Sequence, residues 1–434
     1  MVGTGTPASC TETTFNAALA LVVNDNQGGT PTFNCGPDPD IILLSSVKNL
    51  TGVVTIDGGG KMTLDGQDVT RLFNVNPRPN PQDITDVQLR NITLNRGTSG
   101  AQPFGGAILV NAGTRLALDN VAINDSLAAT SGGAIATFGS VTLGINNSRF
   151  NGNLAANGGA IATRAILNVT GNSFTNNNAL GGEGGAIQSY AEKATITASS
   201  FVSNGARFGG AIFKAFNELI VENSGFTGNS SADDGGAVYA RADAYALVSN
   251  TKLSGNTATR DGGGLFARGP ILIDRTSFSG NRARAGGAIR MDGGDLTIER
   301  ASLLNNTAVL EGGAISALVV SEPGLSNPTM DRVTTSSNRT STGTGGDFAL
   351  TSSVIDIRAR FRNMTLMGAS ASAGGSTLHL GGTMTLDIEQ SLLWAGAGLA
   401  CVSQIGGAIF SLGGNIGSLG CGLAASSDAI SSTF

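Results

Sequence analysis

Aromatic and charged side chains recur at one place in a repeating pattern along the middle of the chain. The tetrapeptide Gly-Gly-Ala-Ile, or a close variant, occurs many times, and the residue directly after it is Phe213, Tyr239 or Phe266 in three successive copies. Arg290 directly follows the copy that begins at Gly286. Tyr190 is the third residue after the copy that begins at Gly184. Aromatic faces beside arginine and carboxylate groups commonly hold sugar rings. The pattern therefore predicts a ligand-binding face formed by these five residues.

Two carboxylates, Asp234 and Asp261, precede the repeated glycines in adjacent copies. One period apart in a stacked structure, such a pair would be spaced as in retaining glycosidases, or it could bind a hard cation such as calcium. A lyase would instead use Arg241 or Arg268 as its base, beside an acid-bound cation. The structural alternative is that stacked rings and interleaved opposite charges only stabilise the repeat. We expect this structural role to predominate and no cofactor to be required.

The repeat that positions these residues is the main sequence signal for the fold. The glycine pair begins at Gly105, Gly132, Gly158, Gly184, Gly209, Gly235, Gly262, Gly286 and Gly312, and again at Gly406. The first nine copies are spaced by about 26 residues, a period typical of solenoids. An apolar residue with Asn three positions later precedes most copies, for example Phe174 with Asn177 and Phe278 with Asn281.

Each period contains two or three short stretches of alternating apolar residues between Gly, Asn and Ser turns, and no segment of helical length. A coil this short cannot bury its own apolar side, but parallel stacking of coils would join the apolar residues into one core. Parallel crossovers are right-handed in most proteins. The sequence therefore predicts an all-β, single-stranded right-handed parallel β-helix, or solenoid, with the repeated Asn at one turn of each coil, where side-chain amides can bond along the stack.

Four cysteines lie in two local pairs, Cys10 with Cys35 and Cys401 with Cys421. At the ends of a chain rich in Gly and Asn they predict two terminal disulfides formed in an oxidising compartment. Four buried free thiols are the alternative. Apolar residues at helical spacing over residues 11–23 predict a short N-terminal capping helix.

The composition excludes some classes of function. Apolar residues make up 40% of the chain and charged residues only 13%, and the formal net charge is −5 with a pI near 5.0. An acidic chain without a basic face is not expected to bind nucleic acid. It has no run of about 20 apolar residues, so we do not expect it to span a membrane. The chain opens at Met1 without the basic and apolar regions of an export signal, so we expect a mature or trimmed form from which that signal is absent.

The combination of Gly-Gly-Ala-Ile and Phe-x-x-Asn, many times over, resembles the repeats of the chlamydial polymorphic outer-membrane proteins and of many bacterial surface proteins with a right-handed β-helix. The resemblance covers residues 105 to 316 well. It implies an exported protein that adheres to other surfaces. The same fold also carries pectate lyases and other enzymes that cleave polysaccharides, so the fold alone does not decide the function.

We therefore predict an N-terminal cap over residues 1–40, β-helix coils over 41–400 and a C-terminal cap over 401–434. The predicted function is that of a secreted or cell-surface bacterial β-helix, acting as an adhesin, a matrix element or a polysaccharide-binding protein through its lateral face. Its partner would be a polysaccharide or a cell-surface receptor. The alternative is a polysaccharide lyase or glycoside hydrolase that uses the same face. If the longer spacing of the later repeats forms a cleft, the site would move toward four other charged residues, Asp331, Arg332, Arg358 and Arg360.

Overall fold

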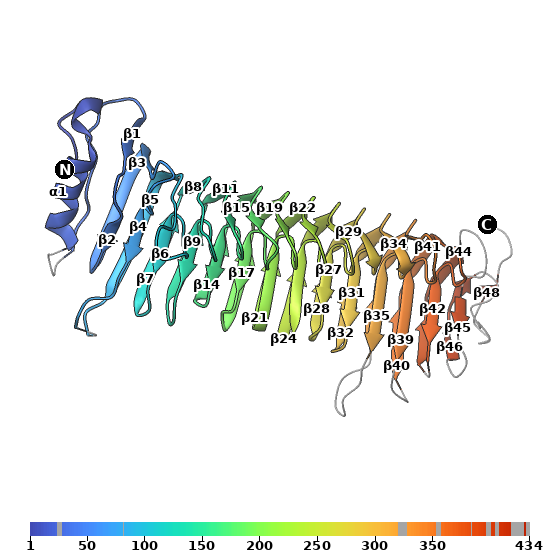
Figure 1. Ribbon diagram of the computed structural model, residues 1–434. Helices are drawn as coiled ribbons and strands as arrows, with labels where there is room; N and C mark the ends of the chain where they lie inside the picture. The colour runs from blue at the N-terminus through green and yellow to red at the C-terminus, as the bar shows by residue number, and fades with distance from the viewer. Residues whose placement is uncertain are drawn as a thin grey trace. The chain divides into compact units, whose positions relative to one another are not determined.

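The computed structural model describes residues 1–23, 28–80, 82–319, 328–352, 357–382, 384–395, 401–403, 408–417 and 429–430. They form two compact units. Unit 1 comprises residues 1–207 and 211–213, and unit 2 comprises residues 208–210 and 214–434. Within each unit the strands stack in parallel from coil to coil (Figure 1), which confirms the predicted parallel β-helix.

Unit 1 contains the 3-10 helix η1 (Pro7–Ser9), the helix α1 (Glu12–Val23) and four stacks of parallel strands. The first stack follows the glycine pairs: β2 (Lys48–Leu50), β4 (Phe73–Val75), β6 (Ile108–Val110), β9 (Ile135–Thr137), β13 (Ile161–Thr163) and β17 (Ile187–Ser189). The second consists of the first parts of β3 (Val53–Asp65) and β5 (Thr85–Asn95), then β7 (Thr114–Asp119), β10 (Thr142–Asn146), β14 (Ile166–Thr170) and β18 (Lys193–Thr197). The third consists of β1 (Asp40–Leu43), the later parts of β3 and β5, β8 (Ala122–Asn124), β11 (Arg149–Asn151), β15 (Ser173–Thr175) and β19 (Ser200–Val202). The fourth is short: β12 (Leu154–Ala155), β16 (Asn178–Ala179) and β20 (Gly205–Ala206).

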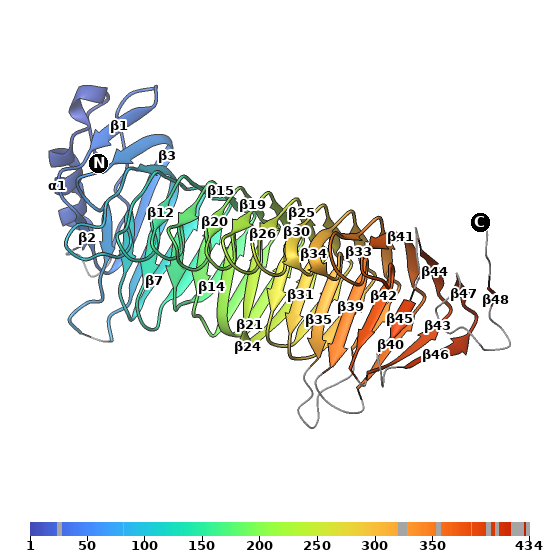
Figure 2. The same ribbon diagram turned by 45° about the vertical axis from the view of Figure 1, so that its right-hand side comes forward.

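Unit 2 repeats this arrangement, and β21 (Ile212–Glu222) has residues in both units. Its first stack contains the start of β24 (Val238–Ser249), β27 (Leu265–Ala267), β31 (Ile289–Asp292), β35 (Ile315–Val319), β39 (Phe348–Ser352), β42 (Leu378–Gly381) and β45 (Cys401–Ser403), several of which are side by side in Figure 2. Its second contains the end of β24, β28 (Ile271–Asp274), β32 (Leu296–Glu299), β36 (Thr329–Asp331), β40 (Arg358–Arg362), β43 (Thr385–Glu389) and β46 (Ala408–Gly413). Its third contains β22 (Gly225–Thr227), β25 (Lys252–Ser254), β29 (Ser277–Ser279), β33 (Ser302–Leu304), β37 (Thr334–Ser336), the start of β41 (Thr365–Ala371), β44 (Leu392–Ala395), β47 (Ile416–Gly417) and β48 (Ala429–Ile430). Its fourth contains β23 (Ser230–Ser231), β26 (Thr257–Ala258), β30 (Arg282–Ala285), β34 (Thr307–Glu311), β38 (Arg339–Thr340) and the end of β41.

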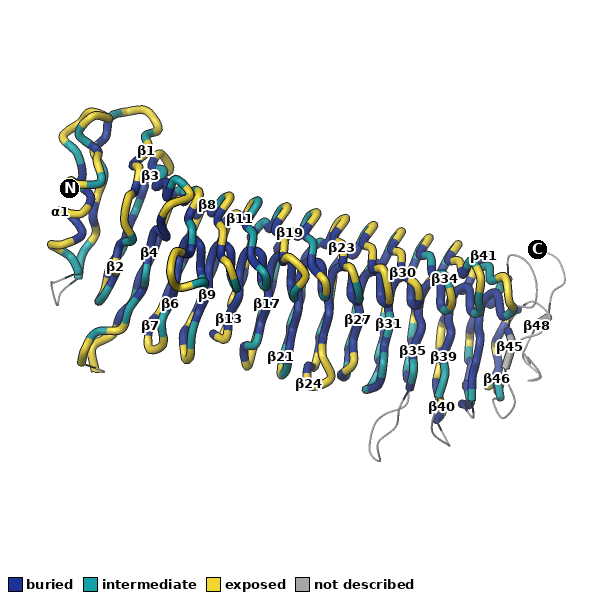
Figure 3. Tube along the Cα trace, viewed as in Figure 1, coloured by how far each residue is buried: buried dark blue, intermediate teal, exposed yellow. Residues whose placement is uncertain are grey.

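The core consists of like side chains stacked one coil above another. In β14 the side chains alternate between exposed and buried, and Leu167 lies in register with Leu143 of β10. The rings of Phe150, Phe174 and Phe201 stack with centroids 4.8 Å apart between neighbours, which is the spacing of adjacent strands. In Figure 3 much of each coil is buried, and many of the exposed residues lie at the turns.

The repeated Asn forms a continuous row of hydrogen bonds within each unit. The side chain of Asn177 donates to the carbonyl oxygen of Phe150 at 2.9 Å and to the side-chain oxygen of Asn204 at 3.0 Å. In unit 2 the same bonds link Asn256 to Asn281. These side chains are fully buried, so the row satisfies backbone and amide groups that would otherwise be unpaired. This confirms that the amides bond along the stack.

The glycine pairs allow a tight corner before each strand of the first stack. Gly132 has a φ of 67°, which glycine adopts without steric cost. A Cβ atom at Gly133 would strike the carbonyl oxygen of Gly159 in the next coil. The chain therefore bends sharply at this point and brings the residues before the glycines over the outer side of the first stack.

The N-terminal end of unit 1 has the predicted helix and disulfide. Helix α1 buries Phe15, and Cys10 is bonded to Cys35 with their Cα atoms 5.6 Å apart. Glu12 accepts a hydrogen bond from the buried Lys48. Burial alone would raise the pKa of Glu12, but hydrogen bonds from Lys48 and Ser45 outweigh it and lower the pKa to about 2.

Of the two cysteines in the second predicted disulfide, only Cys401 lies in the described part of the chain. Cys401 is buried at the start of β45, whereas Cys421 lies outside the described residues, so this pairing stays a prediction. The predicted cap boundaries at residues 40 and 400 also stay predictions. No described helix has the length and apolar character needed to cross a membrane.

Candidate functional site

Small side chains in the first stack of unit 1 leave a recess on its outer side. The middle residues of β9 and β13 are Ala136 and Ala162, and the equivalent residue of β17 is Gln188. Because two neighbouring coils present only methyl groups here, the floor is low and a recess of about 220 Å³ remains. We call it the aromatic recess.

Three half-buried aromatic rings surround this floor. Phe104 and Phe138 meet edge to face, with ring centroids 4.8 Å apart and an interplanar angle of 87°. On the other side, the Tyr190 hydroxyl donates to a carboxylate oxygen of Glu183 at 2.7 Å, and the Gln188 amide donates to the same oxygen at 2.8 Å. The walls are therefore fixed by packing and hydrogen bonds before any ligand arrives.

A buried arginine holds the segment that carries Phe104. The guanidinium group of Arg71 donates to the carbonyl oxygens of Gly105 at 2.8 Å, Gln102 at 2.7 Å and Phe104 at 2.7 Å. It also bonds the carbonyl oxygen of Ser99 at 3.2 Å. Burial lowers the pKa of Arg71. Since one side chain connects four carbonyl groups, Arg71 positions the end wall of the aromatic recess.

Arg164 belongs to the coil between those that carry Phe138 and Tyr190. Phe138, Arg164 and Tyr190 directly follow β9, β13 and β17, so they have equivalent places in three consecutive coils. Arg164 is exposed, and its guanidinium group makes no ion pair within the described ranges. The recess thus combines aromatic faces, a free cation and hydroxyl groups, since Thr137 and Thr163 also line it.

The predicted aromatic face is aligned as expected but is not exposed. Tyr239 and Phe266 are paired in register, and their rings stack with centroids 4.9 Å apart. However, only 2% of Phe213, 5% of Tyr239 and 2% of Phe266 is accessible to solvent. The predicted ligand-binding face is covered because the corner is concave: Phe208, just before a glycine pair, packs its ring against Tyr239 with ring centroids 5.5 Å apart. A buried ring offers no free face to a sugar.

The predicted arginines of unit 2 differ in their availability. Arg290 is largely covered and hydrogen-bonds the side chains of Glu311 and Ser316. Arg268 lies 5.6 Å from the centre of the Phe266 ring and 3.8 Å from a carboxylate oxygen of Asp292. Arg241 is exposed. Arg290 therefore acts in the structure as a partner of carboxylates rather than as a free ligand contact.

Both predicted carboxylates are buried and already bonded. Asp234 accepts the backbone N–H of Asp261 at 3.2 Å, and Asp261 accepts two hydrogen bonds from Arg284, at 3.0 and 3.1 Å. Burial, opposed in part by the charge of Arg260, raises the pKa of Asp234 above its usual range. These contacts favour the structural interpretation of the pair, since catalysis or calcium binding would have to break them.

The alternative site in the later coils is partly assembled. Asp331 and Arg360 line a recess of about 460 Å³ on the second stack of unit 2. Arg332 and Arg358 do not line it: Arg332 pairs with Asp331 at 2.9 Å, and Arg358 pairs with Asp387 at 2.6 Å. Most charges here are compensated by neighbours, so this recess is a weaker candidate than the aromatic recess.

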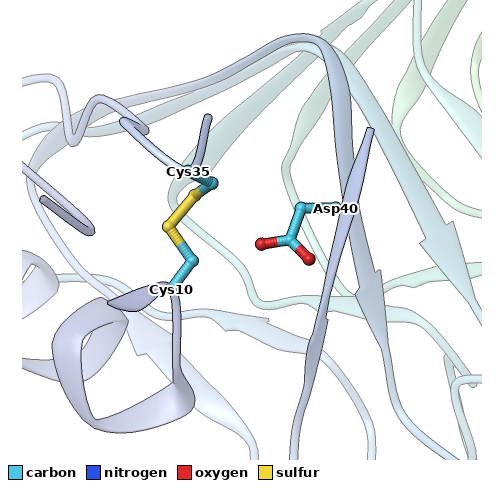
Figure 4. A group of neighbouring side chains, drawn as sticks. All are labelled: Cys10, Cys35 and Asp40. Atoms are coloured by element: carbon cyan, nitrogen blue, oxygen red, sulfur yellow. A yellow bond between two sulfur atoms is a disulfide. The ribbon is translucent and has the colours of Figure 1, made fainter. Parts of the chain in front are cut away.

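One group of three metal-ligating side chains converges in the part of the chain that the structure describes. The sulfur atoms of Cys10 and Cys35 and a carboxylate oxygen of Asp40 lie within 4.8 Å of one another (Figure 4). The two sulfur atoms are joined in the disulfide, and a metal needs thiolates. In the oxidised protein this group is not a metal site.

Sequence reasoning missed Phe104 and Phe138 because it looked for large polar and aromatic residues directly after the repeat motif. A recess is instead marked by small residues at that position, and Ala136 and Ala162 were the available signal. The aromatic residues that wall it lie one place before the glycine pair and one place after the strand. Of the predicted ligand-binding residues, Tyr190 is the one that lines this recess.

Comparison with known proteins bears mainly on the repeat. A mannuronic acid specific polysaccharide family 6 lyase from human gut microbiota shares 11% identity with this chain; the match covers 87% of this chain and 85% of the lyase, with a TM-score of 0.38. PfbA, a surface adhesin of Streptococcus pneumoniae, shares 10% identity; the match covers 94% of this chain and 85% of PfbA, with a TM-score of 0.24. The search of curated proteins found no match. Residues 226–241 match the Chlamydia polymorphic membrane protein repeat. Together with the parallel β-helix, this match confirms the predicted resemblance to the polymorphic membrane protein repeats.

Proposed function

We propose that this protein is a surface or secreted glycan-binding protein and that the aromatic recess of unit 1 is its binding site. One observation carries the proposal: the half-buried rings of Phe104, Phe138 and Tyr190 line one recess with the exposed Arg164, above a floor of alanines. Among the described residues the Arg164 guanidinium group has no carboxylate partner. Sugar rings pair apolar C–H faces with hydroxyl groups, and such a recess complements both. Its walls are fixed in advance, which reduces the entropy lost on binding.

Binding explains the recess better than hydrolysis does. Glycoside hydrolysis generally uses two carboxyl groups on opposite sides of the scissile bond. Among the described residues that line the aromatic recess none is a carboxylate, and nearby Glu183 is bonded to Tyr190 and Gln188. A binding role also agrees with the resemblance to the polymorphic membrane protein repeats, because that resemblance implies adhesion, and adhesion needs contact without turnover. The disulfide at the N-terminal end fits a secreted or surface location.

Variants on either side of the recess test this proposal. Binding of the purified protein to neutral and acidic polysaccharides is measured by biolayer interferometry, and release of oligosaccharides is followed in parallel. We expect Phe138→Ala and Arg164→Ala each to weaken binding about tenfold, the effect of losing roughly 1.4 kcal/mol. Tyr245→Ala and Arg339→Ala are matched controls, because both residues are exposed in unit 2, and they should bind like the unchanged protein.

Three outcomes would contradict the proposal. If the protein binds no polysaccharide, or if the control variants lose binding as strongly as the recess variants, the aromatic recess is not a glycan site. Release of unsaturated or reducing oligosaccharides would favour the enzymatic alternative instead.

A further inference from the structure

A second recess of about 540 Å³ adjoins the aromatic recess, and Arg164 lines both. We call it the arginine recess. Arg115 also lines it, and Ser140 and Thr142 add hydroxyl groups. Arg115 is exposed like Arg164, and neither guanidinium group is paired with a carboxylate anywhere in the described coils. Free guanidinium groups bind carboxylates through two parallel hydrogen bonds.

The strand register fixes the spacing of the two arginines along the stack. Arg115 of β7 pairs with Thr142 of β10, which in turn pairs with Ile166 of β14. Arg164 precedes Ile166 by two residues, so the two arginines belong to coils two steps apart. They are therefore separated by about 10 Å along the stack, twice the distance between neighbouring strands. Two sugar residues of an extended β-1,4-linked chain span a similar length, and in such a chain alternate residues face the same side.

Acidic residues near the arginine recess weaken its attraction for an anionic ligand but do not cancel it. Glu192 also lines the arginine recess and opposes an anionic ligand. Asp86 is paired in register with Arg115 but is not among the lining residues. The charged side chains among the described lining residues are therefore two guanidinium groups and one carboxylate, and Glu192 lowers the affinity of the recess for anions.

From this geometry we propose that the ligand is a polyuronate lying along the stack, with the carboxylates of alternate sugar residues on Arg115 and Arg164. The sugar at Arg164 also rests against the aromatic recess. This inference depends on the proposed glycan-binding function and adds to it the acidic class of the ligand, its direction and a minimum length of three residues.

A length series of oligouronates tests the inference by isothermal titration calorimetry. We expect affinity to rise about tenfold from the disaccharide to the trisaccharide, because only the longer ligand reaches both arginines. Arg115→Ala should abolish this step, because it removes the second carboxylate contact. Arg164→Ala should weaken binding at every length, and Glu192→Gln should strengthen it. Arg339→Ala is the control, and the carboxyl-reduced polymer should bind more weakly than its acidic parent.

The outcomes separate this inference from the proposed function. If no polysaccharide binds at all, both are wrong. If the carboxyl-reduced polymer binds as tightly as the acidic one, the glycan site stands and the acidic ligand is excluded. If Arg115→Ala retains the affinity step between the disaccharide and the trisaccharide, the two-point contact is excluded even though the ligand is acidic.

Discussion

Asp347 ends the row of buried asparagines in unit 2. It occupies the place that Ala314 has in the preceding coil, is fully buried, and accepts hydrogen bonds from Asn338 at 2.8 Å and Thr335 at 2.7 Å. Burial raises the pKa of Asp347 to about 7, although the bonds from Asn338 and Thr335 lower it. In the described part of the chain no charged group contributes to this shift, so burial is its cause.

Asp347 should therefore make the protein more stable in mild acid than at neutral pH. Its pKa rises from an ordinary value of 3.8 to about 7 on folding, so the folded state holds the proton more tightly. Its contribution to stability is complete below pH 4 and is lost as the pH rises through about 7, a loss on the order of 4 kcal/mol. Denaturant unfolding of Asp347→Asn, measured across this range, should lack this part of the pH dependence.

Asp243→Asn is the control for this prediction, because Asp243 is exposed in β24. It should retain the full pH dependence of the unchanged protein. If Asp347→Asn follows the same pH profile as the unchanged protein, the carboxyl group of Asp347 does not titrate in this window.

At the scale of the elements, the buried asparagines link neighbouring coils from Asn153 to Asn204 and from Asn229 to Asn338. Asn281 donates to the carbonyl oxygen of Leu253 and to Asn306, and it accepts from the side chain and the backbone N–H of Asn256, all at 3.0 Å. Asn281→Ala leaves several buried groups without partners, and each costs about 1–3 kcal/mol. We expect the free energy of unfolding to fall by roughly 3–5 kcal/mol, measured in urea.

The exposed Asn178 of β16 provides the comparison for Asn281. Asn178→Ala should change the free energy of unfolding by less than about 0.5 kcal/mol, as expected for a surface site. Equal losses in the two variants would mean that the buried row does not hold the coils together.

The elements also show how far the sequence could predict this molecule. Register and core were predictable, because Ile135, Ile161 and Ile187 recur with the period and do lie in one column. Exposure was not predictable by alternation. The position after each of these residues is outward, yet the sharp bend at the glycine pair folds the preceding segment over it, so Tyr239 is covered. Only packing between segments decides which outward position stays open.

At the scale of the whole chain, a stacked fold must protect its terminal coils, because their strand edges and core have no neighbour on one side. At the N-terminal end of unit 1, β1 and β2 belong to the first coil, and within the described residues both pair only with the next coil. Helix α1 lies at this end (Figure 1), and the bond between Cys10 and Cys35 links the segment before the helix to the segment after it. The disulfide should therefore keep helix α1 in place over the first coil.

Replacing both cysteines, as Cys10→Ser with Cys35→Ser, should destabilise helix α1 most and the coils behind it less. The disulfide joins residues 25 positions apart, and closing a loop of that length stabilises a fold by about 3 kcal/mol. The double variant loses this stabilisation at the N-terminal end. We expect hydrogen exchange, followed by mass spectrometry, to accelerate most in α1, β1 and β2 and less in each successive coil, because each coil contacts only its neighbours. Reduction of the unchanged protein should reproduce the pattern, since it removes the same bond. Unchanged protection of α1 would show that the helix holds to the first coil by packing alone, and a uniform loss across unit 1 would show that its coils unfold as one block.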